Sequence, residues 1–123
     1  EKSDWICDLL EAKLYFEDMV DMLRPRYPVV GIEFGGAFLA YAYTKNSGLI
    51  RKNGDFYFPR KVFWPVSLID DVCASNDSFL EATTTLANQN IRVGEYLTVL
   101  DRRENKNELK VKSLFTINSS VVS

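Results

Sequence analysis

The chain has 123 residues, of which 46% are hydrophobic and 26% are charged, with a formal net charge of −2 at pH 7. These values are typical of one globular domain, so residues 1–123 are predicted to form a single domain. The net negative charge argues against nucleic-acid binding, and no apolar run approaches the ~18 residues of a membrane-spanning helix. Because histidine is absent, Ser-His and Cys-His catalysis are excluded, which leaves acid–base chemistry to carboxylates, Lys or Tyr.

Two features of the sequence concern the cellular compartment. The two cysteines, Cys7 and Cys73, are far apart and share no metal-ligand spacing. We expect both to be buried reduced thiols rather than a disulfide or a zinc site. The first residues lack the basic and then apolar layout of a signal peptide, so residence in the cytoplasm is expected.

The first part of the chain is predicted to form a helix, a strand and a second helix. Apolar residues recur at helical spacing over residues 4–23, and this amphipathic helix should end before Pro25. Residues 29–34 form a run typical of a buried strand. A glycine pair and a short apolar helix over residues 37–44 follow, which together make a parallel crossover unit.

The rest of the chain continues the alternation of strands and helices. In chain order we expect a strand near residues 48–52, an aromatic loop over 53–65, a strand over 66–70, a helix after Ser78 to about Asn88, and strands over 92–100 and 109–117. This pattern predicts an α/β fold, namely a three-layer open, mostly parallel sheet with helices on both faces. Ligands of such folds bind at the carboxyl edge of the sheet.

The strand over residues 66–70 ends in two adjacent carboxylates, Asp70 and Asp71, and a loop of small polar residues follows. This order places backbone N–H groups and a helix N-terminus at the carboxyl edge of the sheet, where phosphate-bearing ligands are commonly bound. The carboxylates can orient ribose hydroxyls and stabilise positive charge on a sugar ring, or form a merely solvated strand end. Because strand side chains alternate, only one of the two is expected to face a given ligand.

Two loops are candidates for holding phosphate groups. Ser75 and Ser78 can donate hydrogen bonds to a phosphate, although a Ser-Asn-Asp-Ser loop is also a common helix cap. The pair Gly35-Gly36 permits positive φ and close approach of a pyrophosphate, although most glycine pairs simply mark turns.

Three cationic side chains are candidates for binding the charged groups of a ligand. Arg51 and Lys52 follow a predicted strand and can pair with diphosphate oxygens, or lie on a solvated edge. Arg102 can form a bidentate pair with a substrate carboxylate, or an ion pair with Asp101 or Glu104.

Residues 29–117 resemble a type I phosphoribosyltransferase, and within that family they look most like orotate phosphoribosyltransferase. The specific part is Leu-Ile-Asp-Asp-Val at 68–72 with the small-residue loop after it, which resembles the signature for phosphoribosyl pyrophosphate (PRPP). Residues 31–37 resemble the pyrophosphate loop, and residues 50–52 resemble the start of the catalytic loop. The run Val-Leu-Asp-Arg-Arg-Glu at 99–104 favours the orotate branch over purine relatives.

The resemblance implies roles for the matching residues. The catalytic residues would be Asp70, Asp71 and Lys52, with the two carboxylates on the ribose hydroxyls. The residues implied to bind PRPP and the base are Phe34, Gly35, Gly36, Arg51, Lys52, Asp70, Asp71, Ala74, Ser75, Asn76, Asp77, Ser78 and Arg102. Within this set, residues 74–78 would surround the 5-phosphate and Arg102 would face the orotate carboxylate.

The resemblance also implies a reaction and its partners. PRPP and orotate, or a related base, would give a nucleoside 5′-monophosphate and pyrophosphate, as in pyrimidine biosynthesis. This glycosyltransferase would work as a homodimer through an oxocarbenium-like state, by positioning and charge stabilisation. Mg²⁺ would enter mainly with the diphosphate, without a dedicated protein metal site.

The chain departs from the family pattern in its loops. The residues after Lys52 lack the further Lys and the His-Gly of the mobile loop, and the N-terminal hood is reduced or absent. Ala74 and Asn76 replace a threonine and a glycine of the phosphate loop, where Asp77 adds an anion. The alternative hypothesis is therefore a catalytically impaired protein of this fold, acting as a nucleotide-binding regulator or as a protein-interaction module through the aromatic residues 56–64.

Overall fold

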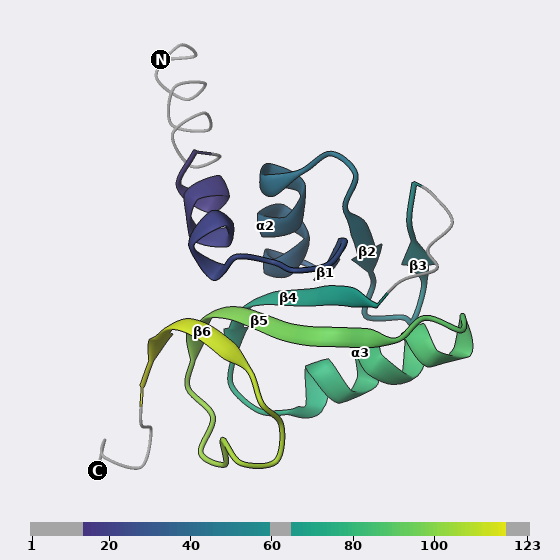
Figure 1. Cartoon of the computed structure of the whole chain (residues 1–123). Coiled ribbons are helices and arrows are strands. Elements are labelled where there is room, and N and C mark those ends of the chain that lie inside the picture. Colours follow the sequence, from purple (N-terminus) through teal and green to yellow (C-terminus); the bar gives the residue numbers. More distant parts are fainter. Residues whose placement is uncertain (1–13, 60–64, 118–123) are drawn as a thin grey trace, which may run out of the picture.

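The computed structural model describes residues 14–59 and 65–117, and its centre is a six-stranded sheet with helices on both faces (Figure 1). The strands are β1 (Val29–Ile32), β2 (Gly48–Ile50), β3 (Phe56–Tyr57), β4 (Val66–Cys73), β5 (Val93–Asp101) and β6 (Lys112–Thr116). They lie in the order β3-β2-β1-β4-β5-β6, and among these strands only the β2–β3 pair is antiparallel. The predicted open, mostly parallel α/β sheet is confirmed.

The middle of the sheet consists of β1 and β4, and both strands are buried. All four residues of β1 are buried, as are the residues of β4 from Val66 to Asp70. Parallel strands covered on both faces have no solvent-facing side, which explains their apolar runs. β1 ends at Ile32 whereas β4 continues to Cys73, so the end of β4 extends beyond its neighbour.

Three helices cover the sheet within the described residues. A helix over residues 14–23 and α2 (Gly35–Tyr43) lie on one face, and α3 (Asp77–Asn88) lies on the other (Figure 1). None of them combines the length and the apolar character that crossing a bilayer requires.

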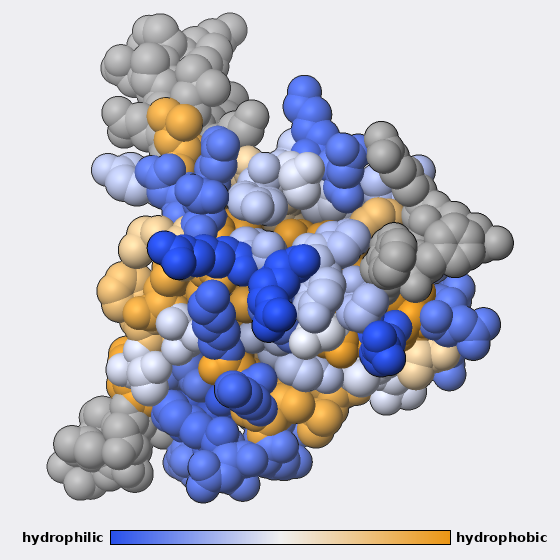
Figure 2. Space-filling model, in the orientation of Figure 1, coloured by the Kyte–Doolittle hydropathy of each residue, from blue (hydrophilic) through white to orange (hydrophobic). Residues whose placement is uncertain are grey.

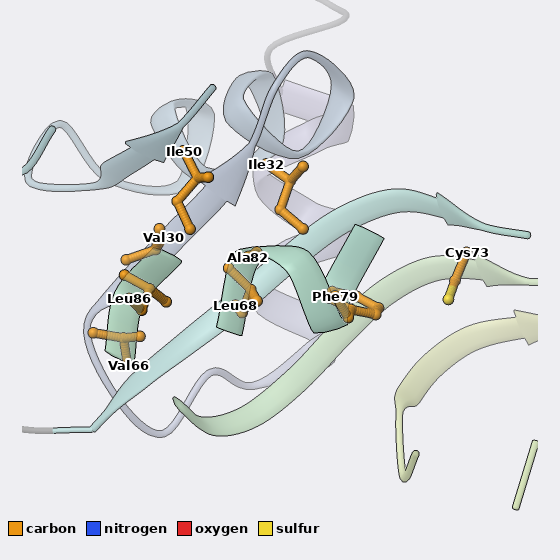
Figure 3. Packing of buried hydrophobic residues seen from close by; sticks show 9 residues of the cluster. All are labelled: Val30, Ile32, Ile50, Val66, Leu68, Cys73, Phe79, Ala82 and Leu86. Carbon is orange, nitrogen blue, oxygen red and sulfur yellow. The ribbon is translucent and has the colours of Figure 1, made fainter. Parts of the chain in front are cut away.

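Each face of the sheet has its own hydrophobic cluster. On the face of α3, the side chains of Phe79 and Leu86 pack with Leu68 of β4 and other buried residues (Figure 3). On the opposite face, Ile69 and Leu97 of the sheet pack with residues of α2 and of the 14–23 helix. Leu68 and Ile69 point to opposite faces, as alternation along a strand requires. These two clusters fix the position of β4 and of the carboxylates that follow.

The structure corrects two of the predicted elements. The loop predicted over residues 53–65 contains β3, because Phe56 and Tyr57 pair with β2. The strand predicted to end at Asp70 continues to Cys73, because β5 extends beside it and pairs Asp101 with Cys73. The helix predicted over residues 4–23 is confirmed for 14–23, and its first part lies outside the described residues.

The thiol of Cys73 is free and only 3% exposed. Its Sγ donates a hydrogen bond to the carbonyl oxygen of Ser75 at 3.2 Å. Burial raises the pKa of Cys73 to about 11. The prediction of a buried reduced thiol is confirmed for Cys73, whereas Cys7 lies outside the described residues.

Candidate functional site

A cavity of about 410 Å³ lies at the carboxyl ends of β1, β2 and β4, next to α3. We call it the acid cavity. Its lining residues are Ile32, Glu33, Phe34, Gly35, Ile50, Arg51, Lys52, Gly54, Asp70, Asp71, Ser78, Glu81, Ala82 and Thr85. Seven of the residues predicted to bind substrate thus meet in one place, although they come from four segments of the chain, residues 34–35, 51–52, 70–71 and 78.

Both carboxylates of the Asp70-Asp71 pair line the acid cavity. Which of the two contacts a given ligand stays a prediction from the alternation of strand side chains. At this point β4 has passed the end of β1, and the Asp71 side chain lies against Gly35 of α2, where no strand separates it from the cavity. Asp70 accepts a hydrogen bond from the N–H of Asp71 at 2.9 Å, and Asp71 accepts one from the N–H of Val72 at 2.8 Å.

The two carboxylates differ in their exposure to water. Asp70 is only 9% exposed, whereas Asp71 is exposed. Burial, reinforced by the neighbouring carboxylate of Asp71, raises the pKa of Asp70 to about 7, and the charge of Lys52 partly opposes this rise. Near neutral pH the pair therefore contains a carboxyl that gains or loses a proton easily and an exposed carboxylate beside it.

The glycine pair allows the first turn of α2 to lie directly against the end of β4. A Cβ on Gly36 would overlap the carbonyl oxygen of Ile69, and a Cβ on Gly35 would overlap the carboxylate of Asp71. Neither glycine has positive φ, and both belong to α2 itself. Close approach, rather than an unusual backbone conformation, is what this position requires.

Arg51 and Lys52 reach the acid cavity from the end of β2, and Glu33 holds this segment in place. The Nε atom of Arg51 lies 3.8 Å from Oε1 of Glu33, and the backbone N–H of Lys52 donates to Oε2 of Glu33 at 2.8 Å. The Arg51 side chain remains 48% exposed. Both cations therefore border the same space as the acid pair and are accessible to an anionic ligand.

The small-residue loop after β4 lines a second cavity of about 380 Å³, which we call the loop cavity. Its lining includes Ala74, Ser75, Asn76 and Asp77 from this loop, together with Arg102 from the segment after β5. Ser78 instead lines the acid cavity, so the first turn of α3 lies between the two. Gly36 lines neither cavity, since it is buried against β4.

Comparison with known proteins identifies the fold. No protein-family model and no curated protein matches the sequence. Among solved structures, orotate phosphoribosyltransferase from Aeropyrum pernix superposes with a TM-score of 0.66 over 83% of this chain and 69% of its own, at 21% identity. The Mycobacterium tuberculosis enzyme with inorganic phosphate gives 0.70 over 85% of this chain and 71% of its own, at 19% identity. The chain has the type I phosphoribosyltransferase fold.

Within this fold, the likeness extends to more than one kind of phosphoribosyltransferase. Adenine phosphoribosyltransferase from Thermoanaerobacter pseudethanolicus superposes with a TM-score of 0.67 over 91% of this chain and 83% of its own, at 12% identity. The M. tuberculosis orotate phosphoribosyltransferase has also been solved with PRPP, and that structure gives 0.61 over 74% of this chain and 63% of its own, at 20% identity. The resemblance predicted from the sequence is confirmed at the level of the fold.

A buried arginine in this phosphoribosyltransferase fold escaped the sequence prediction. Arg103 is 2% exposed and pairs with Asp101, with Nε to Oδ1 at 2.9 Å and Nη2 to Oδ2 at 2.8 Å. Hydrogen bonding between the two side chains lowers the pKa of Asp101 and raises that of Arg103. The neighbouring Arg102 is exposed and free of this pair. The two-residue spacing of Asp101 and Arg103 was the available signal, since it allows both side chains to lie on one side.

A third cavity of about 920 Å³ lies on the face of α2, and we call it the apolar cavity. Gly35 and Asp71 belong to both this cavity and the acid cavity. The other lining residues come from the 14–23 helix, α2, β4, β5 and the end of β6, and they are Phe16, Met19, Phe38, Leu39, Val72, Val99, Leu100, Phe115, Thr116 and Ile117. Figure 2 shows hydrophobic surface between the 14–23 helix and β6.

Proposed function

We propose that the protein transfers a phosphoribosyl group from PRPP to a nitrogenous base and releases pyrophosphate. The observation that carries the proposal is the meeting of Asp70, Asp71, Arg51 and Lys52 in the acid cavity. A ribose diphosphate offers hydroxyl donors and a polyanion, for which carboxylates and cationic side chains are the complementary partners. The PRPP complex of an enzyme with the same fold supports this choice of donor substrate.

The proposed chemistry breaks the bond from C1 of the ribose to the diphosphate and forms a bond from C1 to a ring nitrogen of the base, which releases its proton to water. Positive charge develops on the sugar as the diphosphate leaves. Asp71, which is exposed, would stabilise that charge from the cavity wall, while Arg51 and Lys52 would stabilise the departing anion. This reaction needs no protein nucleophile, which suits a chain without histidine.

We propose that Mg²⁺ accompanies the diphosphate. Mg²⁺ prefers oxygen ligands and keeps several waters, and in nucleotide sites it is bound through one or two carboxylates plus substrate phosphates. The acid pair offers oxygen atoms of this type at the cavity wall. Within residues 14–59 and 65–117 no group of three or more His, Cys, Asp or Glu side chains forms a metal cluster. The remaining ligands would therefore come from the diphosphate and from water.

Two classes of acceptor are proposed, and different observations favour them. Orotate is implied by residues 99–104, with Arg102 as the partner of its carboxylate at the loop cavity. An uncharged base is favoured by the apolar cavity, which adjoins the acid cavity at Asp71. A carboxylate among these apolar side chains would lose hydration, and the Asp71 carboxylate would repel it.

The decisive experiment measures pyrophosphate release from PRPP and Mg²⁺ with orotate, uracil or adenine as the acceptor, at high protein concentration. We expect turnover with at least one base, and Asp71→Asn should lower kcat/KM about 100-fold because it removes the charge beside the reacting sugar. Asp21→Asn, on the exposed surface of the 14–23 helix, is the matched control and should leave turnover unchanged. If no base reacts, the transferase proposal is refuted.

Calorimetry with PRPP and Mg²⁺ separates the alternative from a complete failure. Retained PRPP binding without turnover would favour the nucleotide-binding regulator, whereas absence of both would remove the ribose-phosphate site altogether. The homodimer belongs to the same proposal and is tested by sedimentation equilibrium. Residence in the cytoplasm stays a prediction from the sequence.

A further inference from the structure

A tight turn between β2 and β3 carries the two cations of the acid cavity. The N–H of Gly54 donates to the carbonyl oxygen of Arg51 at 2.9 Å, and the N–H of Arg51 donates to the carbonyl oxygen of Asp55 at 2.9 Å. Gly54 has a φ of 92°, which glycine adopts without strain. Residues 51–55 alone therefore join the two strands, and we call them the cation turn.

The cation turn takes its shape from bonds within the chain. The amide nitrogen of Asn53 donates to Oδ2 of Asp55 at 3.0 Å, and the N–H of Asp55 donates to Oδ1 of Asn53 at 2.9 Å. The strands on either side are paired, with Ile50 opposite Phe56. A short bonded turn thus stands where the family pattern has a mobile loop.

Glu33 joins the cation turn to the end of β1. Its own N–H donates to the carbonyl oxygen of Ile50 at 2.8 Å, which places Glu33 beside the end of β2. Its Oε2 accepts the N–H of Lys52 at 2.8 Å, and its Oε1 lies 3.8 Å from Nε of Arg51. Because Glu33 binds the backbone of Lys52 rather than its ammonium group, this cation remains available to a ligand.

The charge of Glu33 and its contacts have opposite consequences for an anionic ligand. The side chain lines the acid cavity together with Arg51 and Lys52, and it is only 13% exposed. By its charge alone, a carboxylate here would repel a diphosphate, so its removal would strengthen binding. By its contacts, removal would release the cation turn and weaken binding, because ordering two cationic side chains on the ligand would then cost free energy.

We infer that Glu33 is a positioning residue, which fixes the cation turn so that Arg51 and Lys52 already border the acid cavity when the diphosphate binds. The inference rests on the proposed function for the identity of that ligand. It explains why a carboxylate lies among the groups that would bind a polyanion: the tie to the backbone of Lys52 outweighs the repulsion.

The test compares four proteins, namely the unaltered chain, Glu33→Ala, Glu33→Gln and the control Glu95→Ala. Alanine removes the acceptor for the N–H of Lys52 but keeps the backbone bond to Ile50. Glutamine removes the charge but keeps an oxygen that can accept the same N–H. Glu95 is the matched control, because its Oε2 likewise accepts a backbone N–H, from Arg26 at 2.6 Å, near the amino end of β5 and outside the acid cavity.

The first readout is the dissociation constant for PRPP with Mg²⁺, measured by calorimetry. We expect Glu33→Ala to raise it at least 10-fold, Glu33→Gln to leave it within threefold, and Glu95→Ala to change it less than twofold. Unchanged or tighter binding by Glu33→Ala would overturn the inference, since repulsion would then dominate. Equal losses in Glu33→Ala and Glu33→Gln, or in Glu33→Ala and Glu95→Ala, would also overturn it, because charge or general stability would explain them.

The second readout needs no ligand, and it is hydrogen exchange of the Lys52 amide followed by NMR. Loss of the acceptor should speed this exchange about 10-fold in Glu33→Ala, but not in Glu33→Gln or Glu95→Ala. Unchanged exchange in Glu33→Ala would show that Glu33 does not hold the turn and would overturn the inference. If the unaltered chain does not bind PRPP, the proposed function fails, and the exchange rates alone decide whether Glu33 fixes the cation turn.

Discussion

Replacement of Asp70 by asparagine should remove a strong pH dependence of stability. Burial and the neighbouring Asp71 raise the pKa of Asp70 from 3.8 to about 7 in the folded protein. One pH unit corresponds to about 1.4 kcal/mol, so a displacement of roughly 3 pH units corresponds to about 4 kcal/mol. Domains in general have a free energy of unfolding of about 5–15 kcal/mol, so this contribution is a large fraction of the total.

The free energy of unfolding falls as the pH rises, because the folded chain binds the proton of Asp70 more tightly than the unfolded chain does. Below pH 3.8 Asp70 is protonated in both the folded and the unfolded chain, and its ionisation costs nothing. As the pH rises to about 7, the unfolded chain releases this proton while the folded chain retains it, so the free energy of unfolding falls. Above that pH both states are ionised and the full loss remains. Asp70 therefore destabilises the folded protein most at neutral and alkaline pH.

The assay is urea unfolding followed by far-UV circular dichroism, at a series of pH values from about 4 to about 8 that spans the two pKa values. The quantity of interest is the free energy of unfolding of the unaltered chain minus that of Asp70→Asn, since groups common to both cancel. We expect this difference to fall by about 4 kcal/mol across the series. Asp21→Asn, at an exposed position on the 14–23 helix, is the control substitution. A constant difference for Asp70→Asn would refute the argument that burial controls this carboxyl.

Three further predictions test the packing around the site. Gly36→Ala should cost about 1–3 kcal/mol, because its methyl group would overlap the carbonyl oxygen of Ile69; an unchanged urea midpoint would contradict this. Phe79→Ala should cost about 3–5 kcal/mol, since the ring is 1% exposed; the exposed Leu80→Ala should cost far less, and equal losses would contradict the burial argument. Cys73, with a pKa of about 11, should react with iodoacetamide at pH 7.5 roughly 100-fold more slowly in the folded chain than in urea, as followed by peptide mass spectrometry; equal rates would show that the thiol is accessible.

The sequence predicts the architecture because local patterns determine it. The apolar run before Asp70 is what a strand buried on both faces requires, and the small polar loop before Phe79 is a recognisable helix start. These patterns place the acid pair at the carboxyl edge of the sheet. They also predict that Arg51 and Lys52 follow a neighbouring parallel strand, and the structure brings all four residues to one cavity.

Details of the site depend on contacts between distant segments, which no local pattern contains. Whether Asp71 faces the same cavity as Asp70 depends on where β1 ends relative to β4. The Arg103–Asn76 bond joins residues 27 positions apart, and no local pattern predicts it. From the sequence, Arg102 was predicted to pair with a substrate carboxylate or with a neighbouring acidic side chain. In the structure the partner of Asp101 is instead Arg103, and both side chains are buried.

The pairing of β1 with β4 at the middle of the sheet joins two stretches of chain, one that ends before β4 and one that begins with β4. The first stretch carries Arg51 and Lys52 of the acid cavity, and the second carries Asp70, Asp71 and the loop that lines the loop cavity. Neither stretch holds a complete ligand-binding set by itself. Under the proposed function, two separately produced fragments would therefore bind a ribose phosphate only after reassociating, and ligand affinity would report fragment complementation directly.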